Sequence, residues 1–193
     1  MIFNLIIFSI CIYARVDIPS TEISKWNVIQ DDHIWIGWIK ENNIDWCRSY
    51  SIIDAPISQV KILIEDKKNY PNIFKRIEKT EIINDNIVYI ALDMPFPFAG
   101  RDYIVEYIQF EEENSYYYQY SAIENIKFPP YDHYVRLINS MGEWKLTSLD
   151  QDKTQVSYTW NGELRGDFPK WALTQAWTKQ SIEIFSWIEE ALE

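Results

Sequence analysis

Charged side chains on one expected strand are the first candidates for binding chemistry. Arg101 and Asp102 are adjacent, and neighbouring residues of a strand point to opposite faces of a sheet, so both cannot face solvent. A buried charge needs a partner, and Asp93 or Glu106 could pair with Arg101 to hold the sheet together. Alternatively, its guanidinium could face a ligand, because it offers a planar pair of donors to phosphate or carboxylate. The same two roles are open to Arg136.

Aromatic side chains are the second set of candidates. Tryptophan, tyrosine and phenylalanine make up 16% of the sequence, which is enough to supply both a core and a binding surface. The members of this set that lie on expected strands include Trp35, Trp144, Tyr158 and Trp160. They could form a cage for a quaternary ammonium or stack on a ring system, or they could belong to the core.

The side chains able to act as acids or bases do not form a recognisable catalytic set. General acid–base chemistry needs a positioned proton donor or acceptor, and the candidates are Glu106, Tyr107, Arg101, His33 and His133. No nucleophile and base are paired among them, and the sequence has no G-x-S-x-G, phosphate-binding loop or Cys–His arrangement. The two histidines lack the spacing of a zinc site. The sequence therefore predicts no enzyme, no metal and no cofactor.

Length and charge limit the partners. The chain has 193 residues, with 29 acidic and 18 basic side chains and a net charge of -11. Nucleic-acid binding draws its affinity from clustered Lys and Arg, so no nucleic-acid partner is expected, and anionic membrane surfaces are disfavoured. A chain of this length usually folds around one core, and residues 15–193 are expected to form a single domain.

From His33 onward, apolar residues mostly alternate with polar ones, which is typical of strands with one buried face. Strands are expected at 33–40, 45–53, 76–83, 87–94, 103–111, 115–123, 134–139, 143–149 and 155–163. Helices are expected at 56–66 and 169–192. Asn-rich and Gly-containing turns between the strands favour an antiparallel meander.

This order predicts an α+β fold in which a curved antiparallel sheet wraps around the long C-terminal helix. Such a sheet tends to leave space between the two layers, and small apolar molecules bind in spaces of that kind. On the helix, Gln180 and Ser181 interrupt the apolar stripe. They form either a polar notch that faces an internal cavity or the exposed edge of the stripe.

The first residues, Met1–Ala14, are uncharged and apolar, and a polar stretch follows from Arg15. This run has the length of the apolar part of a signal peptide and is too short to span a bilayer comfortably. The sequence predicts an exported protein, secreted or periplasmic, if the segment is cleaved, and a cytoplasmic one otherwise. The structural alternative is a short helix or strand that packs against the core.

Three motifs occur in a characteristic order. PFPFAGRDYI at 95–104 contains a Pro-aromatic-Pro turn followed by Arg-Asp-aromatic, Val135-Arg136 enters a later strand, and GDFPKW at 166–171 precedes the last helix. Together they resemble the START domain, the StAR-related lipid-transfer family of the Bet v 1-like helix-grip superfamily. The resemblance extends over roughly Trp26 to Leu192.

The resemblance implies a helix-grip fold and a lipid-binding or lipid-transfer protein. Such a protein holds one hydrophobic ligand in an internal cavity and makes transient contact with membranes. The candidates for ligand contact are Arg101, Arg136, Glu106, Tyr107, Trp144 and Tyr158. Glu106 and Tyr107 stand where several family members offer basic or small polar residues, which disfavours a phospholipid headgroup. Two alternatives stay open: an enzyme similar to polyketide aromatases and cyclases, and an interaction domain whose own side chains fill the core.

Overall fold

The computed structural model describes residues 15–124, 130–161, 164–166 and 168–193. The strands are β1 (Asn27–Asp31), β2 (Trp35–Glu41), β3 (Ile44–Ile53), β4 (Ile77–Ile82), β5 (Ile87–Leu92), β6 (Gly100–Glu112), β7 (Ser115–Ala122), β8 (Tyr134–Arg136), β9 (Met141–Ser148) and β10 (Thr154–Asn161). The helices are α1 (Ile57–Glu65), α2 (Tyr70–Ile73) and α3 (Leu173–Leu192), with 3-10 turns η1 (Ile23–Lys25), η2 (Lys67–Asn69) and η3 (Lys170–Ala172). None of these helices is both long and apolar enough to cross a membrane. Met1–Ala14 lies outside the described residues, so export stays a prediction.

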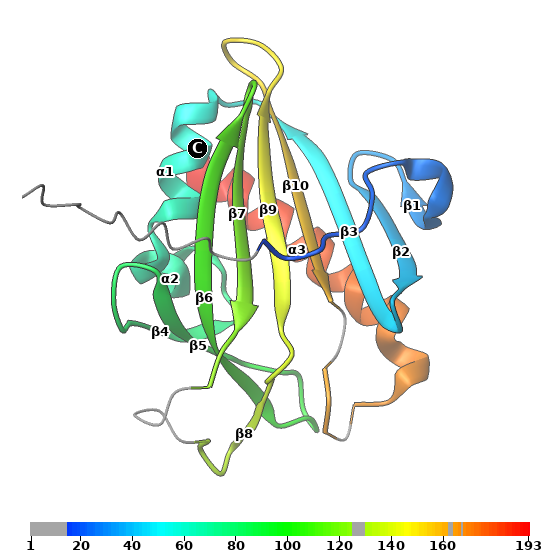
Figure 1. The fold of residues 1–193 in the computed structure, drawn as a ribbon, viewed down its shortest axis with the longest axis vertical. Coiled ribbons are helices and arrows are strands. Elements are labelled where there is room, and N and C mark those ends of the chain that lie inside the picture. Colours follow the sequence, from blue (N-terminus) through cyan, green and yellow to red (C-terminus); the bar gives the residue numbers. More distant parts are fainter. Residues whose placement is uncertain (1–14, 125–129, 162–163, 167) are drawn as a thin grey trace, which may run out of the picture.

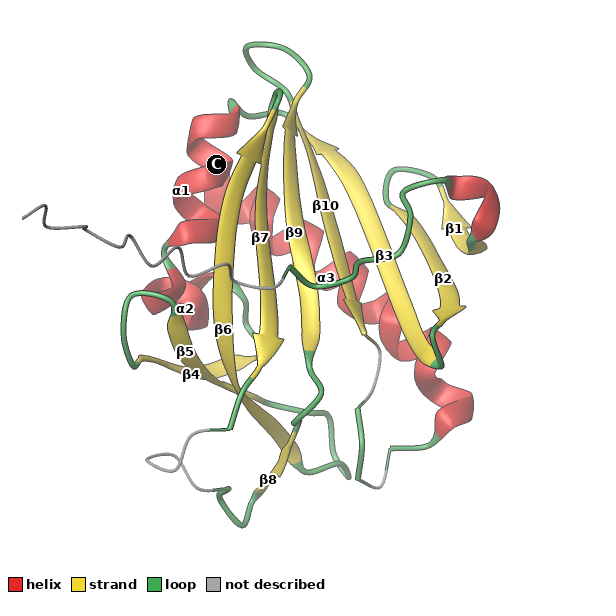
Figure 2. Ribbon diagram, in the orientation of Figure 1, coloured by secondary structure: helices red, strands yellow, loops and turns green. Residues whose placement is uncertain are grey.

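The strands form a sheet that curves around α3 (Figure 1). In the part of the chain that the structure describes, the sheet order is β1-β2-β3-β10-β9-β7-β6-β5-β4, and β8 pairs with β6. Helix α3 runs across the concave face of the sheet, and α1 and α2 contact it on the same side (Figure 2). The predicted α+β fold, a curved antiparallel sheet around a long C-terminal helix, is confirmed.

The sheet differs from the sequence prediction in three details. β1 was not predicted, because a short edge strand with exposed ends has little apolar alternation to detect. The meander is interrupted, since the last strand, β10, lies between β3 and β9 and so pairs with a strand from the early part of the chain. β8 is shorter than predicted and runs parallel to β6, whereas a meander would make it antiparallel to its neighbour.

The main core lies between the concave face of the sheet and the helices. Every second side chain of the central strands points toward it, and the buried members include Cys47, Tyr118, Trp144, Leu146 and Val156. The buried apolar side chains of α3 are Trp177, Ile184, Phe185 and Ile188. Burying each of these large side chains stabilises the fold by about 1.5–3 kcal/mol, so α3 is held chiefly by its apolar face.

The chain before β1 crosses the convex face of the sheet, as the dark blue segment in Figure 1 shows. Arg48 of β3 anchors it, because its Nη1 and Nη2 atoms donate to the carbonyls of Ser20 and Pro19, each at 2.9 Å. The Nε atom of Arg48 donates to Thr159 Oγ1 at 2.8 Å, so all three donor positions are engaged. The ring of Trp26 covers the guanidinium at 4.5 Å. This segment is therefore fastened to the sheet by a buried cation.

Replacing the anchor should destabilise the protein. The Arg48→Met substitution keeps most of the packed stem but leaves two carbonyls and a hydroxyl without their donor, so we expect a loss of about 2–4 kcal/mol in the free energy of unfolding. Urea unfolding followed by circular dichroism measures it. The control is Lys25→Met, which removes a cation from an exposed ion pair with Glu22 and should leave the unfolding midpoint nearly unchanged. Equal midpoints for both variants would contradict the anchoring role.

Candidate functional site

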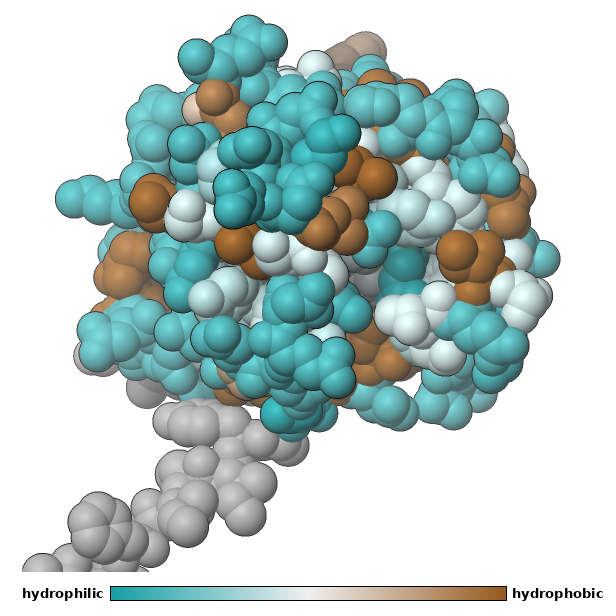
Figure 3. Space-filling view, turned by 90° about the horizontal axis from the view of Figure 1, so that it is seen from above, coloured by the Kyte–Doolittle hydropathy of each residue, from teal (hydrophilic) through white to brown (hydrophobic). Residues whose placement is uncertain are grey.

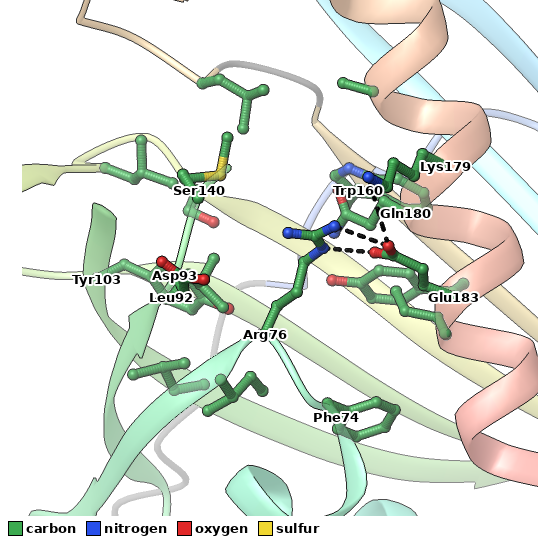
Figure 4. Close-up of a pocket in the computed structure, with 18 of the residues that line it drawn as sticks. Phe74, Arg76, Leu92, Asp93, Tyr103, Ser140, Trp160, Lys179, Gln180 and Glu183 are labelled. Atoms are coloured by element: carbon green, nitrogen blue, oxygen red, sulfur yellow. Dashed lines mark hydrogen bonds and ion pairs between the residues drawn. The ribbon is translucent and has the colours of Figure 1, made fainter. Parts of the chain in front are cut away.

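A pocket of about 310 Å³ lies between the concave face of the sheet and α3 (Figure 4). Its walls come from α2, from β4 to β7, from β9 and β10, and from α3. The connections between β5 and β6 and before α3 complete them. Most of the side chains in these walls are aromatic or aliphatic. The sheet and the helix thus enclose a space that suits an apolar guest.

Tyrosines from three strands and one helix line the pocket. They are Tyr70 of α2, Tyr103 and Tyr107 of β6, Tyr120 of β7 and Tyr158 of β10. Tyr103 and Tyr107 share a face because they are four residues apart on one strand. Tyr107 is paired with Tyr120 across the two strands, with ring centroids 5.7 Å apart. The strand register therefore gathers phenol groups on one wall.

The hydroxyl groups of these tyrosines differ in their partners. Tyr70 donates to the carbonyl of Ile64 at 2.6 Å, and the hydroxyls of Tyr120 and Tyr158 are hydrogen-bonded at 2.8 Å. The hydroxyls of Tyr103 and Tyr107 have no hydrogen-bond partner among the described residues. Both rings lie in the pocket wall, so these two hydroxyls are available to a guest.

Burial controls the ionisation of these phenols. Loss of hydration raises the pKa of Tyr103, Tyr107 and Tyr120 well above the ordinary value, and neighbouring tyrosines add to the effect. Burial also raises the pKa of Tyr158 to about 12, against a lowering by its hydrogen bond with Tyr120. At neutral pH the wall is therefore a set of uncharged O–H groups.

Charged groups meet at one side of the pocket (Figure 4). Arg76, just before β4, binds Glu183 of α3 through both arms, with Nε–Oε2 at 2.5 Å and Nη2–Oε1 at 2.7 Å. The hydrogen bond with Glu183 raises the pKa of Arg76. Lys179 lies one helical turn before Glu183, with its Nζ 4.0 Å from the carboxylate. Because Arg76 and Glu183 neutralise each other, this pair closes the wall between sheet and helix without leaving a free charge.

Tyr107, Trp144 and Tyr158, three of the predicted ligand-binding residues, lie in the pocket wall. Tyr158 is stacked between Trp144 and Trp160, at centroid distances of 4.1 Å and 4.6 Å. Contact of these residues with a ligand stays a prediction. Trp35 lies elsewhere, because it packs with Trp26 and Trp46 in a cluster separate from the main core.

The other three predicted ligand-binding residues, Arg101, Arg136 and Glu106, lie outside the pocket wall. Arg101 is fully buried, and its guanidinium donates to the carbonyls of Leu164 at 2.9 Å, Arg165 at 3.0 Å and Ala99. Its expected partners, Asp93 and Glu106, are therefore replaced by main-chain oxygens. Arg101 ties β6 to the segment that leads into α3.

Arg136 and Glu106 also have structural partners. Arg136 binds the buried carboxylate of Asp102 through both arms, at 2.8 Å and 2.7 Å, and this hydrogen-bonded pairing raises the pKa of Arg136. The hydroxyl of Tyr89 donates to the same carboxylate at 3.3 Å. Glu106 accepts a hydrogen bond from Asn86 Nδ2 at 3.0 Å. These contacts hold strands together outside the pocket wall, and contact of Arg136 and Glu106 with a ligand stays a prediction.

The structure adds pocket residues that the sequence analysis did not single out. Arg76, Glu183 and Tyr120 carried no motif, and Tyr103, although it lies in the motif at 95–104, was not named as a pocket residue, nor was Tyr70. The spacing of Tyr103 and Tyr107 on one strand was a usable signal. The two polar residues of the last helix are now placed: Gln180 lines the pocket, as the polar-notch interpretation expected. Ser181 is fully buried against Cys47 of β3.

No protein-family model matches the sequence. An uncharacterized protein of Pseudomonas aeruginosa is 22% identical over 153 residues, which cover 76% of each chain. Solved structures are similar in fold at lower identity. The STAR-related lipid transfer protein of Xanthomonas axonopodis has a TM-score of 0.75 at 16% identity, covering 87% of this chain and 98% of that one. Human STARD10 has a TM-score of 0.77 at 14% identity, covering 92% and 81%.

A second kind of protein shares the architecture less closely. The Zhui aromatase/cyclase from a Streptomyces species has a TM-score of 0.54 at 18% identity, covering 76% of this chain and 92% of that one. The chain therefore has the START-type helix-grip fold, in agreement with the three sequence motifs. Because these structures are distant in sequence, the agreement is one of fold.

The buried tyrosines give a test of the pocket by pH. Tyrosines of the unfolded chain ionise near pH 10, whereas Tyr107 stays protonated to higher pH in the folded chain, so the free energy of unfolding should fall as pH rises above 10. Each such tyrosine lowers the free energy of unfolding by about 1.4 kcal/mol for each pH unit above pH 10. The Tyr107→Phe variant should therefore lose stability less steeply by that amount. Urea unfolding between pH 9 and 11 measures both slopes, and identical slopes would show that Tyr107 is hydrated.

Proposed function

We propose that the protein binds one hydrophobic or amphiphilic molecule in the pocket and carries it between membranes. The observation that supports this most is the pocket itself, which is walled by aromatic and aliphatic side chains and lies between the sheet and α3. A guest that hides about 200 Å² of apolar surface there gains roughly 5 kcal/mol at ~25 cal/mol per Å², before the cost of ordering.

The volume of the pocket limits the size of the guest. Ligand pockets span roughly 300 to 1,000 Å³, and the 310 Å³ here lies at the lower end of that range. The space suits a ring system or part of one acyl chain better than a whole phospholipid with two chains. The neutralised Arg76–Glu183 pair agrees with this, because neither side chain is free to bind a phosphate.

The titratable groups of the pocket favour a carrier over an enzyme. Acid–base catalysis at neutral pH works best with a group whose pKa lies near 7. Burial moves the pKa of Tyr103 and Tyr107 away from that range, and Arg76 is engaged with Glu183. The greater similarity to lipid-transfer structures than to the aromatase/cyclase also supports the carrier. A defined pocket argues against a domain whose core is entirely filled.

Exposed apolar side chains next to the pocket rim suggest where a membrane is met. Phe96 is 96% exposed, Trp171 is 78% exposed and Ile138 is 47% exposed. Each adjoins pocket residues in sequence: Pro95, Ala172 and Leu137 line the wall. In contrast, hydrophilic side chains dominate the end of the molecule seen in Figure 3, with apolar ones in small separate groups. With a net charge of -11, the protein should favour neutral over anionic lipid surfaces.

Blocking the pocket should abolish binding. We expect the naphthalene probe N-phenyl-1-naphthylamine to bind the wild-type protein at one saturable site, with a rise in its fluorescence. The Ala176→Trp substitution places a large ring in the pocket and should weaken binding about tenfold or more. Thr174→Trp, on the exposed side of the same helix, is the matched control and should bind like the wild type. Failure of the wild type to saturate would refute the proposed function.

Charging the exposed apolar residues should impair membrane contact. In the Phe96→Asp/Trp171→Asp variant, the loss of two large apolar side chains should lower binding to phosphatidylcholine vesicles about tenfold or more. Vesicle co-sedimentation measures it, and probe binding in solution should be retained. The control is Ile62→Asp on α1, which removes an exposed apolar side chain away from the pocket. Equal sedimentation of all variants would place the membrane contact elsewhere.

A further inference from the structure

The tyrosine wall of the pocket carries hydroxyls that have no hydrogen-bond partner in the described part of the chain. Tyr103 and Tyr107 each present a hydroxyl that has no partner in the described part of the chain. Tyr120 and Tyr158 share one hydrogen bond of 2.8 Å, so one of their two hydrogens is used and the other is not. Only Tyr70 donates to the protein main chain, at the carbonyl of Ile64.

An unpaired hydroxyl in an apolar wall is costly. Removing an O–H group from water without giving it a partner costs about 1–3 kcal/mol, so these donors are satisfied either by water or by the guest. The neighbouring rings of Trp144, Trp160 and Phe74 also line the pocket, and none of them carries a hydrogen-bond acceptor for these hydroxyls. A guest that brings an oxygen acceptor to this wall satisfies the donors and buries its apolar part at the same time.

We propose that the guest carries a neutral oxygen acceptor, such as a ketone or ester carbonyl, and that one of the two unpaired hydroxyls, that of Tyr103 or that of Tyr107, donates to this oxygen. This inference rests on the proposed function and makes it more specific. Tyr103 and Tyr107 then select among apolar molecules of similar size, because a hydrocarbon leaves both hydroxyls unpaired. A guest that leaves a buried hydroxyl unpaired loses more affinity than a guest that lacks an apolar group of similar size.

The surroundings of the tyrosines disfavour an anionic acceptor. The charged groups that line the pocket in the described part of the chain are Arg76, Lys179, Asp93 and Glu183; Arg76 is bound to Glu183 through both arms, and Lys179 is an exposed side chain 4.0 Å from the same carboxylate (Figure 4). The same burial that raises the pKa of Tyr103 and Tyr107 penalises any other negative charge beside them. A carboxylate or phosphate beside the tyrosines would pay this desolvation penalty, with the exposed Lys179 as the one described pocket cation not bound through both arms, whereas a neutral carbonyl carries no such penalty.

Two naphthalene probes of similar size test the inference. Prodan carries a ketone whose fluorescence shifts to longer wavelength when the oxygen accepts a hydrogen bond, and N-phenyl-1-naphthylamine carries no carbonyl. For the wild type we expect Prodan to bind with the emission of a hydrogen-bonded ketone. In the one of Tyr103→Phe and Tyr107→Phe that removes the donor, we expect its emission to shift to shorter wavelength and its affinity to fall roughly two- to tenfold. Binding of N-phenyl-1-naphthylamine should change little in either variant.

Controls separate this inference from the proposed function. Tyr117→Phe removes a hydroxyl from a tyrosine that stacks on Phe110 away from the pocket, and both probes should bind it as they bind the wild type. Binding of both probes with no effect of either pocket substitution on Prodan would overturn the inference and leave the carrier function standing. Failure of both probes to bind the wild type would overturn both. Prodan bound to the wild type with the emission of a ketone that accepts no hydrogen bond would also overturn the inference, and this readout does not depend on the folding of a variant.

Discussion

The tie between β6 and the segment that enters α3 is the constraint on which the rest of the structure depends. Arg101 holds the carbonyls of Leu164 and Arg165, and Gly166, with φ at 61°, turns the chain against Val135 of β8. A β-carbon at Gly166 would lie 3.0 Å from a Val135 methyl, which makes glycine the residue that fits. Because α3 starts from this fixed point, its apolar face is aligned with the concave sheet. The space left beside the helix is the pocket.

The buried charges of Arg48, Arg101 and Asp102 serve this framework and lie outside the pocket wall. Asp102 and Arg136 pair through two hydrogen bonds beside the tie, and Arg48 is committed to the segment on the convex face. Removing one partner of such a buried pair is costly, so these side chains cannot easily serve a changing set of guests. What remains for recognition is the shape of the pocket and the hydroxyls of Tyr103 and Tyr107. Selection by neutral hydrogen bonds follows from this division of roles.

The sequence predicted the sheet and the last helix well because burial on one face imposes a period of two or 3.6 on the residues. It marked the three motifs that meet at the tie, but not what each side chain does there. Two acceptors of Arg101 are main-chain carbonyls 63 and 64 residues away, and a main-chain carbonyl has no signature in a sequence. Likewise, Arg76 and Glu183 are 107 residues apart and meet only in the fold. Trp144 and Tyr158 line the pocket because they lie on inward faces of strands, and their contact with a ligand stays a prediction.

The proposed function, a carrier for a compact, uncharged amphiphile, rests on the fold, the pocket and the exposed apolar side chains at its rim. The most direct measurement is native mass spectrometry of the protein purified under gentle conditions, followed by organic extraction and identification of the bound molecule. The account predicts one neutral molecule per chain, small enough for the 310 Å³ pocket and bearing an oxygen acceptor. An empty protein that also takes up nothing from lipid vesicles would contradict the account.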